Sequence, residues 1–260
     1  GFLPPTSSPV VFFSSFCLMC DVASQATTPI RPFGMIGASR TERVSNMTKG
    51  KMELVLILDK SGSMHGLEAD TVGGFNSLIA KQKEDGGDVR LTLVTFNQDM
   101  DLVHDAVPLT WFQGLNERDY VTGGATALHD AVGKTLSSVS SRSRDANPED
   151  RPDRVLVVIT TDGMENASRT YRHGDIRELI GRLRGAYDWE FMFLGANIDS
   201  RKTAQDIGIS HRRASDYHAD SRGIRPEYRS LEKAVSQFRM CKTIDDDWDE
   251  IVKQDFKERT

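Results

Sequence analysis

The chain has 260 residues, of which 38% are hydrophobic, enough apolar material for one large α/β domain with a sizeable core. Its formal net charge of -5 and its short basic stretches give no electrostatic reason to expect a nucleic-acid partner. Three cysteines are too few for a disulfide framework, and the pair Cys17 and Cys20 lacks the further ligands that a zinc site needs.

Residues 1–46 differ in composition from the rest of the chain. Proline and serine recur there without helical or strand periodicity, which predicts a disordered extension or an upstream addition, with Met47 or Met52 as the natural start. The apolar stretch from Val10 to Cys20 is shorter than the roughly 20 residues that span a bilayer. No Lys or Arg precedes Arg31, so this stretch is a poor signal peptide. We therefore expect a cytoplasmic protein without a membrane partner.

The stretch from Met52 to Met64 joins a buried strand to a polar loop. Leu54 to Leu58 is an unbroken apolar run, typical of a strand that is covered on both faces of a parallel sheet. The run ends at Asp59, and Ser61 and Ser63 follow at alternate positions of a tight loop. A carboxylate and two hydroxyls are hard oxygen ligands, the kind that Mg²⁺ prefers. The loop is therefore a candidate site for a divalent cation.

A helix is predicted after this loop, because mostly apolar side chains recur there at helical spacing. They are Leu67, Thr71, Phe75, Leu78 and Ile79. Gly73 and Gly74 lower the helix propensity, so either a neighbour packs closely there or the helix bends. Strands are expected at Val89–Phe96 and Asp101–Val107. Their link is too short for a crossover helix, so the two strands form an antiparallel hairpin at a sheet edge.

The rest of the chain alternates between helices and strands. Helices are expected at Thr126–Val139, around Ile176–Leu183, at Arg201–Ile207 and around Leu231–Phe238 after Pro226; strands are expected at Arg154–Thr160, Trp189–Leu194 and Ala214–His218; residues 140–153 read as an exposed loop. Trp248, Ile251, Val252 and Phe256 keep helical spacing. They predict that residues 240–260 form an amphipathic C-terminal helix or tail, packed on a domain that spans residues 47–239.

Strands that alternate with helices predict an α/β fold. We expect a doubly wound, Rossmann-like and mostly parallel sheet with one antiparallel edge strand and helices on both faces. Ligand sites in such sheets lie beyond the carboxyl ends of the strands, where the strand order reverses. Asp59 ends the first buried strand, and Asp162 follows the strand at Arg154–Thr160. The topology and the loop motif therefore point to the same edge of the sheet.

Three separated motifs at this edge resemble those of von Willebrand factor A (VWA) domains. The loop with Asp59, Ser61 and Ser63 is similar to the first part of the family's metal-ion-dependent adhesion site. Thr126, in a loop with two glycines, and Asp162 match the two further parts in the same order. The resemblance spans about residues 47–239 and implies a sheet whose first and fourth strands are adjacent at its centre.

The resemblance also implies a role for each of these five residues. Ser61, Ser63 and Thr126 would bind a divalent cation, Mg²⁺ or else Mn²⁺ or Ca²⁺, through their hydroxyls. Asp59 and Asp162 would hold it mainly through water. An open coordination position would then attract an Asp or Glu side chain of a partner protein, which is the family's usual binding mode.

Plainer interpretations stay open beside this one. Taken singly, the serine motif is a turn with a helix N-cap, Thr126 is another N-cap, and Asp162 belongs to a turn. A Mg²⁺-dependent phosphohydrolase of the haloacid-dehalogenase type also has an aspartate at the end of a central strand. Such enzymes use a second aspartate two residues later, where this chain has Ser61. The chain has no Walker loop, GxGxxG turn or GxSxG elbow, so we expect a non-enzymatic binding module.

Other polar residues near the motifs carry weaker expectations. Lys60 occupies a variable position of the motif and is expected to face solvent. Asp130 is expected to be a solvated helix residue, and His65 a surface histidine. Glu165 and Asn166 follow the Asp162 turn, where they could shape the rim of the site.

Overall fold

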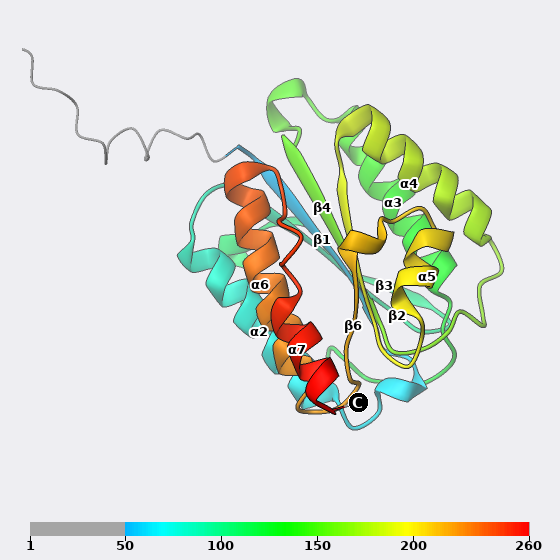
Figure 1. Cartoon of the computed structure of the whole chain (residues 1–260). Helices are drawn as coiled ribbons and strands as arrows, with labels where there is room; N and C mark the ends of the chain where they lie inside the picture. Colours follow the sequence, from blue (N-terminus) through cyan, green and yellow to red (C-terminus); the bar gives the residue numbers. More distant parts are fainter. Residues whose placement is uncertain (1–49, 260) are drawn as a thin grey trace, which may run out of the picture. The chain divides into compact units, whose positions relative to one another are not determined.

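A six-stranded sheet forms the centre of the region that the computed structural model describes, residues 50–259 (Figure 1). The extension predicted for residues 1–46 lies outside the described residues. The strands are β1 (Met52–Asp59), β2 (Val89–Phe96), β3 (Met100–Pro108), β4 (Arg154–Thr161), β5 (Glu190–Gly195) and β6 (Ala214–Asp216). Each of them begins within a few residues of the strand that the sequence predicts.

The strand order is β3-β2-β1-β4-β5-β6, and the hairpin pair β2 and β3 is antiparallel while the other described pairs are parallel. The predicted fold class is confirmed. The chain runs outward from β1 in one direction through β2 and in the other through β4, so the order reverses beside β1. The carboxyl ends of β1 and β4 therefore meet at the position where such sheets bind ligands.

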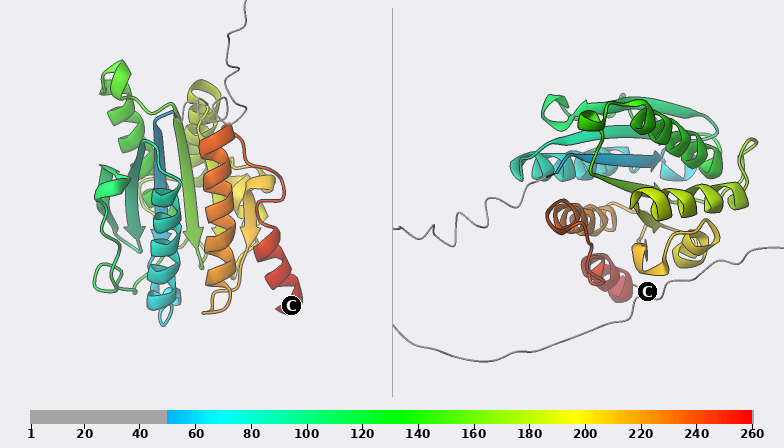
Figure 2. Two further views of the ribbon diagram at one scale, coloured as in Figure 1. Left: turned by 90° about the vertical axis from the view of Figure 1, so that its left-hand side faces the viewer. Right: turned by 90° about the horizontal axis from the view of Figure 1, so that it is seen from above.

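Helices cover both faces of the sheet (Figure 2). They are α2 (Glu68–Glu84), α3 (Leu128–Asp145), α4 (His173–Tyr187), α5 (Ser200–Asp206), α6 (Ile224–Cys241) and α7 (Glu250–Arg259), with the 3-10 turns η1 (Gly62–Met64), η2 (Leu109–Trp111), η3 (Pro148–Asp150) and η4 (His211–Arg213). Leu54, Leu56 and Leu58 face the core under α2 and α6, and Val55 and Ile57 face the core under α3 and α4. None of the helices in the described region is long and apolar enough to cross a membrane.

Three local predictions are wrong. Helix α3 continues to Asp145, into the segment predicted to be a loop. Helix α6 begins at Ile224, before Pro226, because a proline in the first helical turn removes an N–H that has no helical partner anyway. Ile251 is 37% exposed, although it was expected on the packed face with Trp248 and Val252. Trp248 precedes α7, so helical spacing does not relate it to Ile251.

Gly74 marks a close approach between α2 and α6. A Cβ added at Gly74 would lie 2.2 Å from Cδ2 of the buried Tyr228, whereas nothing lies within 4 Å of a Cβ added at Gly73. We expect Gly74→Ala to lower the free energy of unfolding by about 1–3 kcal/mol, because the packed ring must shift. Gly73→Ala should raise it by up to about 1 kcal/mol through helix propensity. Denaturant unfolding measures both values, and equal effects would contradict this packing.

Candidate metal centre

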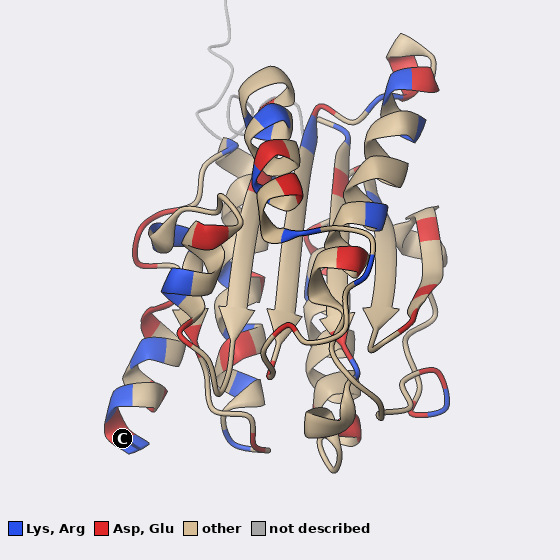
Figure 3. Ribbon diagram, turned by 90° about the vertical axis from the view of Figure 1, so that its right-hand side faces the viewer, with Lys and Arg blue, Asp and Glu red and all other residues tan. Residues whose placement is uncertain are grey.

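Three loops meet at the carboxyl edge of the sheet. They follow β1, precede α3 and follow β4, and red acidic segments lie directly beyond the strand arrowheads there (Figure 3). Backbone hydrogen bonds join them: Gly62 N–H donates to Gly124 O at 3.0 Å, and Asn166 N–H donates to Thr126 O at 3.0 Å. The loops therefore form one connected unit, although they lie far apart in the sequence.

The hydroxyls predicted to bind a cation gather between these loops. Ser61 Oγ lies 3.1 Å from Ser63 Oγ, and Ser63 Oγ donates to Asp162 Oδ1 at 2.6 Å. A Cβ added at Gly163 would lie 3.3 Å from Thr126 Oγ1 and 3.4 Å from Ser63 Oγ, so both hydroxyls face this glycine. The structure thus brings Ser61, Ser63, Thr126 and Asp162 together at one place.

Asp59 organises the first of these loops. Its carboxylate is buried, and Oδ1 accepts the Ser61 N–H at 2.7 Å while Oδ2 accepts the hydroxyl of Thr161 at 2.6 Å. Burial raises the pKa of Asp59 to about 6, against hydrogen bonds from Thr161 and Ser61 that lower it, and the charge of Asp162 raises it further. With both oxygens already bound, Asp59 suits an indirect role through water.

Asp162 has one buried oxygen left over. Its Oδ2 has no hydrogen-bond partner within residues 50–259, and burial raises the pKa of this carboxyl while the Ser63 hydroxyl lowers it. A buried carboxylate oxygen without a partner is costly. A cation or its bound water would satisfy this oxygen, and the surrounding hydroxyls are ligands of the type that Mg²⁺ accepts. The residues present therefore fit a divalent cation.

Several residues that support the site were missed by the sequence reasoning. The hydroxyl of Tyr120 donates to the carbonyl of Asp59, and Asn197 Nδ2 donates to Asp162 O at 3.3 Å. Asn166 was expected only at the rim, but its Oδ1 also accepts the Thr126 N–H at 2.9 Å. Thr161, which donates to Asp59, was also missed, and its position directly before Asp162 was the one signal in the sequence that could have found it. Nothing in the sequence marks Tyr120.

Two expectations about charged residues near the site are wrong. The side chain of Lys60 is mostly covered and pairs with Asp101 on β3. Asp130 is buried on α3 and accepts the backbone N–H groups of Thr170 and Tyr171 at 2.8 Å each. Both partners come from segments distant in the sequence, which explains why local reasoning assigned both side chains to solvent.

The fold and these loops define a doubly wound α/β protein with a candidate cation site at the switch in strand order. The family model described as von Willebrand factor type A domain matches residues 53–224. The chain belongs to this family, as the resemblance of its three motifs predicted. No curated protein matches the chain by sequence.

Solved structures with low sequence identity share the fold. A variant of the PilB minor pilin from Streptococcus sanguinis superposes with a TM-score of 0.52 at 12% identity, over 76% of this chain and 62% of that one. Proximal thread matrix protein 1 of the mussel byssus, with zinc in its metal-ion-dependent adhesion site (MIDAS) motif, gives a TM-score of 0.52 at 12% identity, over 72% of this chain and 48% of that one. The chain thus spans less than two thirds of the length of these proteins.

Proposed function

We propose that the carboxyl-edge site holds one Mg²⁺ or Mn²⁺ ion and binds, through it, an acidic side chain of a partner protein. The observation that carries this proposal is the gathering of the Ser61, Ser63 and Thr126 hydroxyls beside the unpartnered buried oxygen of Asp162. Helix capping does not account for this arrangement. Ser61 precedes η1 but makes no side-chain capping bond, and the residue directly before α3 is Ala127 rather than Thr126.

The charges of the site suit a divalent ion. The two carboxylates, Asp59 and Asp162, are both buried, burial raises the pKa of each, and no positively charged group of the described region is among the causes that oppose this rise. A divalent cation would balance the two charges. Neutral hydroxyls as its nearest ligands would leave the ion attractive to a further carboxylate. Membership of the VWA family and the zinc in the mussel protein's site agree with this assignment.

Metal binding tests the proposal directly. Titration calorimetry with Mg²⁺ or Mn²⁺ should show one binding site in the wild type. Ser61→Ala and Thr126→Ala should each lower the metal affinity by at least about tenfold, because losing a group that only orients a metal ligand already has an effect of that size. Ser138→Ala, an exposed serine on α3, is the matched control and should bind like the wild type.

Unchanged affinity in both site variants would refute the assignment of these ligands. A phosphatase assay tests the binding function itself. If the purified protein hydrolyses a simple phosphate ester above a metal-free control and loses this activity on Asp59→Asn, the site belongs to a phosphohydrolase.

A further inference from the structure

Two large apolar side chains stand exposed on the loops of the metal centre. Met164 is 73% exposed and Val121 is 65% exposed. Single exposed apolar residues are common on protein surfaces and need no special explanation. These two differ because they lie on two separate loops of one candidate binding site.

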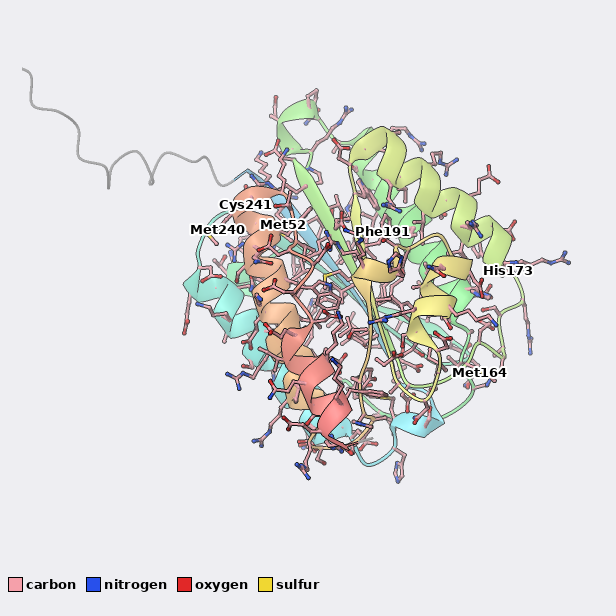
Figure 4. All side chains as sticks on the ribbon, viewed as in Figure 1. Met52, Met164, His173, Phe191, Met240 and Cys241 are labelled. Atoms are coloured by element: carbon pink, nitrogen blue, oxygen red, sulfur yellow. The ribbon has the colours of Figure 1, made fainter. Side chains whose placement is uncertain are left out.

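The neighbours of both residues in the chain lie beside the proposed ligands. Val121 lies between Tyr120, whose hydroxyl donates to the carbonyl of Asp59, and Gly123, whose N–H donates to Lys60 O at 2.9 Å. Met164 follows Gly163, whose added Cβ would lie within 3.4 Å of the hydroxyls of Ser63 and Thr126. Figure 4 labels Met164 among the loops at the carboxyl edge, beside η1.

Two further carboxylates near the site, at the start of α2 and on the loop after β4, accept hydrogen bonds within the protein. Glu68 accepts the Gly66 N–H at 2.8 Å and the hydroxyl of Thr122. Glu165 accepts the N–H groups of Ala167 and Ser168 at 2.9 and 2.8 Å. Both carboxylates are therefore engaged by donors within the protein.

We infer that the partner presents its Asp or Glu between apolar side chains, which contact Val121 and Met164. This inference rests on the proposed function, because the carboxylate is drawn to the site by the cation. The cation alone would attract any exposed carboxylate and so supplies little selectivity. Burying apolar surface on both sides of the carboxylate adds affinity only for a matching segment. The flexible thioether of Met164 can adapt to more than one apolar neighbour.

Labelled synthetic peptides test this inference by fluorescence anisotropy in excess Mg²⁺. Three peptides with the cores Leu-Asp-Leu, Ser-Asp-Ser and Leu-Asn-Leu, in identical glycine-rich flanks, separate the two contributions. We expect the wild type to bind the first about tenfold more tightly than the second, and the third hardly at all. The double variant Val121→Ser/Met164→Ser should bind the two acidic peptides alike, while calorimetry shows its Mg²⁺ affinity unchanged.

Met240→Ser is the matched control, because Met240 is also exposed, at 57%, but lies at the far end of α6 (Figure 4). It should keep the wild-type preference. Equal binding of the two acidic peptides by the wild type, a preference that survives in the double variant, or no binding of Leu-Asp-Leu by the Mg²⁺-loaded protein would each overturn this inference and leave the metal site intact. A wild type that binds no Mg²⁺ in calorimetry would instead refute the proposed function, and this inference with it.

Discussion

Replacing Trp248 by alanine is expected to lower the free energy of unfolding by about 3–5 kcal/mol, the usual cost of emptying a large core site. Trp248 is fully buried in the core under α2 and α6, and its Nε1 donates to Arg212 O at 2.8 Å. It lies beyond residue 224, where the match to the family model ends. The loss would therefore show that the C-terminal segment folds as part of the domain.

Trp111 provides the control for this experiment, because the same side chain is 74% exposed there. Trp111→Ala should change the free energy of unfolding by no more than about 0.5 kcal/mol. Denaturant unfolding followed by far-ultraviolet circular dichroism avoids any dependence on the removed fluorophore. If both substitutions lower the free energy of unfolding equally little, the residues around Trp248 do not unfold together with the rest of the domain.

Replacing Glu227 by glutamine is expected to stabilise the protein at alkaline pH. Glu227 is buried on α6, and burial raises the pKa of its carboxyl from 4.5 to about 8. Between these two values the folded protein holds a proton that the unfolded chain releases, so the stability of the wild type falls as the pH rises through this window. The fall in the free energy of unfolding is on the order of 5 kcal/mol. Glutamine stays neutral at every pH, so the variant lacks this loss of stability.

Two tyrosines whose pKa values respond to the charge of Glu227 do not titrate in the same window. Burial raises the pKa of Tyr217 and of Tyr228 well above the usual tyrosine value, so both phenols remain neutral. Unfolding free energies measured from pH 4.5 to 9 should therefore converge at the acidic end for the wild type and Glu227→Gln, diverge in favour of the variant as the pH rises to about 8, and differ by a constant amount above it. Glu178→Gln, an exposed position on α4, should follow the wild-type profile. Parallel profiles for the wild type and Glu227→Gln would show that Glu227 ionises freely.

The order of helices and strands could be predicted from the sequence, because each of them has its own spacing of apolar residues or is bounded by turn-forming residues. The apolar run at Leu54–Leu58 and the short link between β2 and β3 correctly indicated a buried parallel strand and an antiparallel hairpin. Element ends were less predictable. The serine- and arginine-rich end of α3 looks like a loop, but it forms the last helical turns up to Asp145.

Side-chain partners across the fold were beyond local reasoning. Lys60 meets Asp101 only because β3 folds back beside β2, and Asp130 meets the N–H groups at 170–171 only because α3 lies next to the loop before α4. The meeting of Asp162 with the loop of Ser61 and Ser63 was predictable, because strand ends of a parallel sheet share one edge, whereas Thr126 was placed there only by the family resemblance. The support from Tyr120 was not predictable, because that residue lies in an irregular segment without periodicity.

The distance in sequence between the site loops has a kinetic consequence. Ser63 and Asp162 are separated by 99 positions, and their contact requires β1 and β4 to be already paired. Contacts of such long range form late, after the loop-closure entropy of the sheet has been overcome. A ligand of this site therefore binds the finished fold and cannot assist its early assembly. Its presence should lengthen the lifetime of the native state while refolding proceeds at the rate of the free chain.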